Sequence, residues 1–288
     1  GRMLEGIEEI ILKEAPDALM VYGDTNSTIA GALAAKKLHV KVIHIESGLR
    51  SFNMAMPEEV NRILTDRISD ILYCPTEQAV ANLKKEGFEN MEARIVKCGD
   101  VMQDAANYFA KHLNKRTRLS STFSFPSYIL CTFHRAENTD NPEKLKNIVD
   151  AINQMNNDVP VVVPLHPRTA NCLKNAGLTL NAHVIDPVGY MDMIDLIQQS
   201  SLVMTDSGGL QKEAFFFHKP CVTLRDETEW IELVDNGFNV LTGADASKII
   251  SEAKSMLDKQ FDFDVNLYGN GTASKRIAED IQSFFGNN

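Results

Sequence analysis

The chain has 288 residues, of which 44% are hydrophobic and 24% are charged, a balance typical of a globular protein with ample core. Its 39 Asp and Glu residues against 29 Lys and Arg give a formal charge of −10. This excess of acid argues against a nucleic-acid binder, which needs a basic face. No apolar run approaches the ~18 residues of a membrane span. The five cysteines are scattered without a CxxC pair. We therefore expect a cytoplasmic protein with reduced thiols and no membrane partner.

Short apolar runs alternate with helical periodicity through the first part of the chain. Apolar residues share one stripe in residues 3–14, which predicts an amphipathic helix. Further helices are expected near 26–38, from Pro57, and near 77–86. The predicted strands are Ala18–Tyr22, Val40–Ile45, Ile71–Cys74 and Arg94–Cys98. Such an order predicts a parallel sheet with helices on both faces.

The alternation breaks at residues 114–126, which we interpret as the connection between two domains. A last helix near 272–285 follows the turn signal at Gly269–Gly271, and we expect it to pack back across the domain boundary. Strands are predicted at Tyr128–Phe133, Val159–Pro164, His183–Ile185, Leu202–Thr205 and Cys221–Leu224. The predicted ranges are 1–113 for an N-terminal Rossmann-like domain, 127–270 for a C-terminal nucleotide-binding domain and 271–288 for the returning helix. Two parallel α/β domains that face a cleft are the predicted architecture.

One motif of the second domain is typical of a phosphate site. The strand that ends at Thr205 continues into Asp206-Ser207-Gly208-Gly209 and then into a helix. Glycines allow a ligand to approach the backbone closely, and the first N–H groups of a helix attract phosphate. Glu213 follows within that helix and is placed to accept hydrogen bonds from a ribose. A plain turn with Ser207 as helix cap explains the same residues.

Three carboxylates follow successive elements of the first domain. Asp24 comes after the first strand, Glu46 after the second, and Glu58 lies in the first turn of the next helix. Alternation along the strand places His44 on the same side as Glu46. Carboxylates in different environments suit the removal and return of a proton. Helix capping and dipole complementarity are the alternative for Asp24 and Glu58.

Basic residues follow two strands of the second domain. His134 and Arg135 come after one strand, and His166 and Arg168 come after the next. Two strand ends that offer His and Arg predict an anion site. No His, Cys or Asp cluster has the spacing of metal ligands. A serine hydrolase is disfavoured because Ser207 lacks the G-x-S-x-G elbow.

Taken together, these segments resemble the UDP-N-acetylglucosamine 2-epimerases, in the family's order and over nearly the whole chain. The matching stretches are Tyr22-Gly-Asp-Thr-Asn26, His44-Ile-Glu-Ser-Gly-Leu-Arg50, Pro57-Glu-Glu-Val-Asn-Arg62, His134-Arg-Ala-Glu-Asn138, Thr205-Asp-Ser-Gly-Gly-Leu-Gln-Lys-Glu-Ala214, Leu224-Arg-Asp226 and Thr228-Glu229. The resemblance implies an α/β fold of GT-B type, with two Rossmann-like domains and a central cleft. It also implies a homodimer, a UDP-sugar substrate and no cofactor, NAD included. The implied reaction eliminates UDP to a 2-acetamidoglucal and adds it back with the opposite configuration at C2, for surface polysaccharide synthesis.

Site residues are carried over from the resemblance one by one. The catalytic group would comprise Asp24, Glu46, Glu58 and His134, with the base among the carboxylates left open. The diphosphate would lie on Ser207, Gly208 and Gly209, the ribose on Glu213, and the uracil on Val188 and Met193. The other residues expected to bind substrate are Arg62, Arg135, His166, Arg168 and Trp230.

The chain departs from the family pattern in two places. It opens on a helix, and the family's first strand and Gly-Thr-Arg-Pro-Glu turn are absent, so the chain alone is expected to have little activity unless that part is supplied. Trp230 also stands where many members carry arginine, and an indole can stack on a sugar or base but cannot neutralise phosphate. This version is similar to relatives that act on UDP-2,3-diacetamido-2,3-dideoxyglucuronate.

Three other functions share parts of this pattern. A hydrolysing 2-epimerase would release free sugar and UDP, and a GT-B glycosyltransferase would need an acceptor. A nucleotide-sugar-binding module without turnover would bind UDP and exchange no proton.

Overall fold

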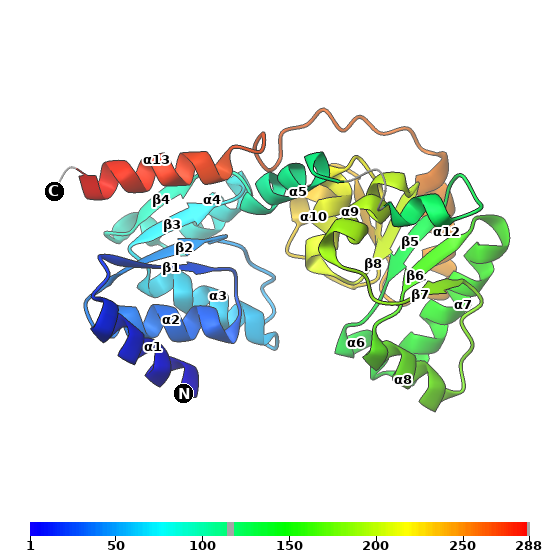
Figure 1. Cartoon of the computed structure of the whole chain (residues 1–288), viewed down its shortest axis with the longest axis horizontal. Helices are drawn as coiled ribbons and strands as arrows, with labels where there is room; N and C mark the ends of the chain where they lie inside the picture. Colours follow the sequence, from blue (N-terminus) through cyan, green and yellow to red (C-terminus); the bar gives the residue numbers. More distant parts are fainter. Residues whose placement is uncertain (114–117, 287–288) are drawn as a thin grey trace. The chain divides into compact units, whose positions relative to one another are not determined.

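The computed structural model describes residues 1–113 and 118–286, which form two compact units (Figure 1). Unit 1 comprises residues 1–105 together with the C-terminal segment from Asn266, and unit 2 comprises Ala106–Val265. We expected the connection between the domains at residues 114–126, whereas the first part of unit 1 ends at Ala105 and unit 2 begins at Ala106. Residues 114–117 lie outside the described residues, and the part after them packs on unit 2, where Phe123 and Phe125 contact Tyr128.

Unit 1 is built on a parallel sheet in the order β1-β2-β3-β4. Its strands are β1 (Ala18–Tyr22), β2 (Lys41–Ile45), β3 (Ile71–Cys74) and β4 (Arg94–Lys97). Its helices are α1 (Arg2–Glu14), α2 (Asn26–Lys37), α3 (Pro57–Ile68), α4 (Glu77–Lys85) and α13 (Ala273–Gly286), and α5 (Val101–Lys111) runs from unit 1 into unit 2. Every strand and helix predicted for this part is confirmed to within two residues.

Apolar side chains cover both faces of this sheet. On one face Ile11 of α1 and Ala32 of α2 pack against Val42. On the other face Ile277 of α13 packs against Ile43 and Tyr73. Figure 1 shows α13 and the pair α1 and α2 on opposite sides of the sheet. The last helix therefore belongs to unit 1.

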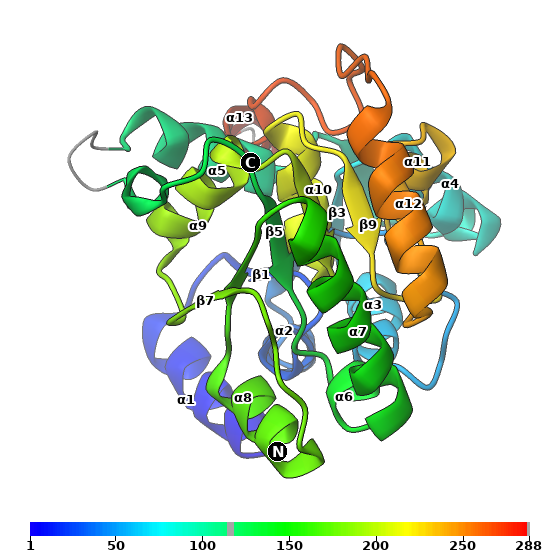
Figure 2. The same cartoon turned by 90° about the vertical axis from the view of Figure 1, so that its right-hand side faces the viewer.

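Unit 2 holds a second parallel sheet, in the order β10-β9-β8-β5-β6-β7. The strands are β5 (Ile129–Thr132), β6 (Val161–Pro164), β7 (His183–Ile185), β8 (Leu202–Thr205), β9 (Cys221–Thr223) and β10 (Asn239–Leu241). The helices are α6 (Ala136–Thr139), α7 (Pro142–Asp158), α8 (Pro167–Ala176), α9 (Tyr190–Gln199), α10 (Gly208–Phe216), α11 (Ile231–Asp235) and α12 (Ala246–Asp258). Helices α7 and α12 cover one face, and α9 and α10 cover the other (Figure 2).

Helix α5 and strand β10 are among the elements that the sequence did not predict. Strand β10 has three residues and pairs through Asn239–Leu241 with β9. Among the helices that the structure describes, none is long and apolar enough to cross a membrane.

Candidate active site

In unit 1 the turn after β1 carries Asp24, and Arg62 of α3 binds it. The Arg62 guanidinium donates to the Asp24 carboxylate and, at 2.7 Å, to Glu59 Oε2. Its side chain is 4% exposed. The asparagine before it, Asn61, donates to the Asp24 carbonyl at 2.9 Å. One helix face thus holds both the backbone and the carboxylate of Asp24.

Glu59 is a buried residue that the sequence prediction missed. Its carboxylate accepts hydrogen bonds from the backbone N–H groups of Ser51 and Phe52, both at 3.0 Å, in addition to the bond from Arg62. Phe52 has a φ of +58°, a region that side chains rarely adopt. Glu59 therefore fixes the loop before α3. Its three-residue spacing from Arg62 on a helix was the available signal.

The other two predicted carboxylates have different surroundings. Glu46 is half-buried with a φ of +69°, because β2 ends at Ile45 and the backbone turns there. The strand alternation from which His44 and Glu46 were expected to share a side ends at Ile45, and their shared side stays a prediction. Glu58 is exposed in the first turn of α3.

In unit 2 the chain passes from β8 into α10 through the predicted phosphate turn. Ser207 is the N-cap, and its hydroxyl accepts from Leu210 N at 3.4 Å. A Cβ atom on Gly208 would lie 2.5 Å from Glu229 Oε1, so this position has no room for a side chain. The first N–H groups of an α-helix have no partner within the helix, so the start of α10 is the part of this turn that suits a phosphate.

Asp206 joins this turn to the loop after β5. The carboxylate is fully buried and accepts from the backbone N–H groups of His134 and Arg135 at 3.0 Å and from Asn138 Nδ2 at 3.1 Å. His134 Nδ1 lies 3.5 Å from Asp206 Oδ1, and the His134 side chain is 49% exposed. The structure thus brings His134 and Arg135 beside Ser207. The sequence prediction named Asp206 only as part of the motif.

Trp230 is placed differently from the sequence interpretation. Its residue exposure is 3%, and the Lys212 ammonium lies 4.0 Å from the centre of its ring. The indole is therefore covered and cannot offer an open face to a sugar or base in this conformation. The Trp230 backbone N–H donates to Thr228 Oγ1 at 3.2 Å. This bond and the burial of the indole give Trp230 a packing role.

The nucleoside-binding candidates lie around α9. Val188 and Met193 are both partly buried against the same apolar cluster. Glu213 of α10 is 5% exposed. Burial, and then the charge and hydrogen bond of the Glu213 carboxylate, raise the pKa of Tyr190 above its ordinary value. Tyr190 is thus a neighbour of Glu213 that the sequence prediction left out.

The basic residues after β6 are engaged locally. His166 caps α8, where its Nδ1 accepts from Arg168 N at 3.2 Å. Arg168 donates to both oxygens of Asp140 at 2.7 Å. Both side chains belong to exposed residues. The structure therefore gives them structural partners, and it does not join them to His134.

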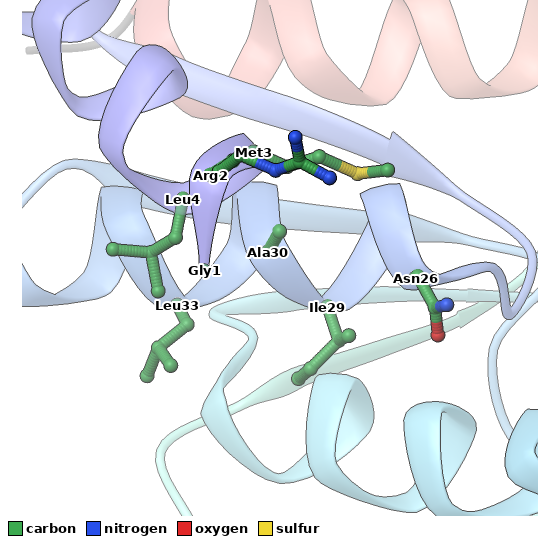
Figure 3. A pocket seen from close by; sticks show the side chains of 8 residues that line it. All are labelled: Gly1, Arg2, Met3, Leu4, Asn26, Ile29, Ala30 and Leu33. Atoms are coloured by element: carbon green, nitrogen blue, oxygen red, sulfur yellow. The ribbon is translucent and has the colours of Figure 1, made fainter.

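Two further observations limit the chemistry of the described residues. No group of three or more His, Cys, Asp or Glu residues among them could hold a metal ion. A pocket of about 410 Å³ lies between α1 and α2 (Figure 3), next to Met3, Leu4, Ile29 and Leu33. Its lining includes none of the predicted site residues.

The family model described as UDP-N-acetylglucosamine 2-epimerase matches residues 1–282. The chain belongs to this family. Family membership makes it an epimerase-type enzyme, an isomerase, and its two parallel α/β units belong to a fold of GT-B type.

Individual members of the UDP-N-acetylglucosamine 2-epimerase family agree with this assignment. The UDP-2,3-diacetamido-2,3-dideoxy-D-glucuronate 2-epimerase of Pseudomonas aeruginosa is 60% identical over 97% of this chain and 78% of its own. The crystal structure of Methanocaldococcus jannaschii UDP-GlcNAc 2-epimerase with UDP-GlcNAc and UDP has a TM-score of 0.90 at 42% identity, over 98% of this chain and 80% of its own. The Neisseria meningitidis enzyme bound to UDP-GlcNAc has a TM-score of 0.86 at 31% identity, over 98% and 80%.

Proposed function

We propose that this epimerase inverts C2 of a UDP-2-acetamido sugar by eliminating UDP and adding it back. The family match over residues 1–282 carries the proposal. A carboxylate removes the C2 proton while the C1–O bond to UDP breaks, which leaves a C1=C2 double bond. A proton then returns to the opposite face of C2, and the UDP oxygen attacks C1. The cycle is redox-neutral, so it calls for no cofactor.

The residue roles follow from the chemistry of each group. Asp24, Glu46 and Glu58 are the candidates for the base and the acid at C2, because each follows the carboxyl end of a strand or begins the next helix. The salt bridge with Arg62 holds the Asp24 carboxylate in a fixed position, which suits a base. We do not assign the other two an order.

In unit 2 the departing diphosphate gathers negative charge that needs stabilisation. The N-terminus of α10 at Ser207–Gly209 supplies backbone N–H groups and the positive end of the helix dipole. His134 and Arg135, held by Asp206, add a proton donor and a charge. We assign the ribose to Glu213 and the uracil to Val188 and Met193. His166 and Arg168 stand as secondary candidates for the anion.

Two sugars are candidate substrates. The P. aeruginosa relative at 60% identity is named for UDP-2,3-diacetamido-2,3-dideoxyglucuronate, and the M. jannaschii relative at 43% for UDP-N-acetylglucosamine. The higher identity makes the diacetamido-uronate the first sugar to test and UDP-N-acetylglucosamine the second.

Proton NMR in D₂O tests the reaction with each sugar. We expect deuterium at C2 together with the C2-inverted product when the family's first strand and turn are supplied with the chain, and loss of both in Asp24→Asn. Asp17→Asn is the matched control, because Asp17 is an exposed residue just before the other end of β1. Free sugar with UDP would point to a hydrolysing epimerase. Binding of UDP without exchange of either sugar would overturn the epimerase proposal in favour of a binding module.

The proposal extends to the setting of the enzyme. We propose a cytoplasmic homodimer that supplies a surface polysaccharide, as the family resemblance implies. Light scattering after gel filtration tests the dimer, and a monomeric mass would contradict it.

A further inference from the structure

A buried cluster of charged side chains lies outside the proposed catalytic residues of unit 1. His44 and Asp66 are fully buried, and Arg50 is 1% exposed. Arg50 donates to Asp66 Oδ2 at 2.7 Å, and its other nitrogens donate to Glu86 at 2.6 and 2.8 Å. The cluster joins β2, α3 and α4 and contains two basic and two acidic groups.

The hydrogen bonds of His44 determine where its protons lie. His44 Nε2 is 2.8 Å from the carbonyl oxygen of Gly23, which can only accept, so Nε2 carries a proton. His44 Nδ1 is 2.7 Å from Asp66 Oδ1. If the Asp66 carboxyl is ionised, then Nδ1 must carry a proton as well.

Asp66 has the surroundings of an ionised carboxylate. Its Oδ2 accepts from Arg50 and, at 3.1 Å, from the backbone N–H of Gly48. Burial alone would raise the pKa of Asp66, but the hydrogen bonds and charges of His44 and Arg50 lower it below its ordinary value. A proton therefore lies between His44 Nδ1 and Asp66 Oδ1 and joins the two side chains.

We propose that His44, held by Asp66, positions Asp24 for the reaction. This inference rests on the proposed function, in which Asp24 is a candidate base. His44 Nε2 donates to the Gly23 carbonyl, one residue before Asp24, at a turn where Gly23 has a φ of +62°. The same helix α3 supplies Asp66 to His44, Asn61 to the Asp24 carbonyl and Arg62 to its carboxylate. Helix α3 therefore holds the backbone before and after the Asp24 nitrogen, and it also holds the Asp24 carboxylate.

Asp66 also reaches the second candidate carboxylate. Its bond to Gly48 N holds the turn that carries Glu46, and a Cβ on Gly48 would lie 2.5 Å from the Ala79 carbonyl oxygen. The Glu46 turn therefore cannot shift toward α4. One ionised aspartate thus sets the two turns at the ends of β1 and β2.

Nitrogen-15 NMR of the histidine-labelled full chain tests the hydrogen bond from His44 to Gly23 directly. We expect Nε2 of His44 to carry a proton that is protected from exchange with solvent. In Asp66→Asn, which replaces the carboxylate that orients the ring, that proton should exchange faster. An unprotonated Nε2 in the native chain would overturn the proposal, whether or not the enzyme turns over.

The positioning role is tested separately with His44→Gln, which keeps a donor but removes the imidazole ring. Misplacement of a catalytic group by about 1 Å costs about 100-fold, so we expect kcat to fall by about that factor with little change in KM. His39→Gln, on an exposed residue next to β2, is the matched control. An unchanged kcat in His44→Gln would overturn positioning. If the native chain shows no turnover, the NMR signals of the Gly23 and Asp24 amides serve as the readout in place of kcat. Unchanged amide signals in His44→Gln would then overturn the positioning role.

Discussion

Adjacent glutamates at the start of α3 have opposite roles. Glu58 is exposed, whereas Glu59 is buried and holds two backbone N–H groups and Arg62. Breaking such a buried pair costs about 3 kcal/mol, so Glu59→Gln should lower the free energy of unfolding by that amount. Glu58→Gln should change it by less than about 0.5 kcal/mol while lowering kcat. Urea denaturation and the exchange assay separate the two. Equal stability loss in both variants would contradict the assignment.

Gly208 is the position where the phosphate turn has least room. A Cβ there would lie 2.5 Å from Glu229 Oε1, a carboxylate that Arg225 holds at 3.0 Å. Gly208→Ala should therefore displace the start of α10 and weaken UDP binding by at least tenfold, about 1.4 kcal/mol. Gly189→Ala is the control, because nothing lies within 4 Å of its added Cβ. Calorimetry measures the affinity of both variants for UDP, and equal affinities would contradict a phosphate site at the Ser207–Gly209 turn.

The cysteines differ in expected reactivity. Burial raises the pKa of the Cys74, Cys98 and Cys221 thiols to about 12, and the thiolate is the reactive form. Cys172 is half-buried. Mass spectrometry after brief alkylation of the native protein at neutral pH should find label on Cys172 and not on those three. Early labelling of Cys74 or Cys98 would contradict the buried sheet of unit 1.

At the scale of elements, the sequence predicted the strands well because a parallel sheet is buried on both faces. Its strands then stand out as apolar runs between helices. Strand β10 escaped because three residues, Asn239–Leu241, leave no pattern to detect. Glu46 was named from the sequence, but the left-handed φ at which its strand geometry ends was not predictable, because no residue type at that position signals it.

The site was predictable only in part, because its contacts join residues that are far apart in the sequence. The order of the motifs indicated candidate residues, and the structure adds which of them are in contact. Asp24 with Arg62, and His134 with Asp206, are contacts across 38 and 72 positions of sequence. Conversely, the pairing of Arg168 with Asp140 could not be foreseen from the His-Pro-Arg motif, because Asp140 lies on a different loop.

Helix α13 is docked on unit 1 by Asp280. Tyr73 donates to Asp280 at 2.9 Å, and burial followed by this bond raises the pKa of Tyr73 above its ordinary value. The neutral phenol therefore stabilises the fold fully below the ordinary tyrosine pKa of about 10, and this contribution is lost as the pH rises through the raised value.

Asp280→Asn tests that docking. It should lower the pKa of Tyr73 and cost about 1–3 kcal/mol of stability at neutral pH. Glu279→Gln, on the exposed side of the same helix, should do neither. Alkaline absorbance titration and urea denaturation give the two readouts. An unchanged Tyr73 titration in Asp280→Asn would show that α13 does not dock through this pair.

At the scale of the whole molecule, each unit has its own core. The clusters around Ile129 and Tyr128 are built from residues of unit 2, and those around Ile11 and Ile43 from residues of unit 1. None of these four clusters combines residues of both units. The proposed roles follow this separation: the carboxylates that transfer the C2 proton are in unit 1, and the residues that bind the nucleotide are in unit 2.

Unit 2 should therefore fold and bind UDP alone. Residues 106–265 carry the Ser207–Gly209 turn, Asp206 with His134, and Glu213 with Tyr190, together with the core beneath them. We expect cooperative unfolding in urea and an affinity for UDP within about tenfold of the full chain, or 1.4 kcal/mol, without proton exchange at C2. Gly208→Ala in the same fragment is the control and should abolish binding. A folded fragment that does not bind UDP would mean that residues of unit 1 also hold the nucleotide.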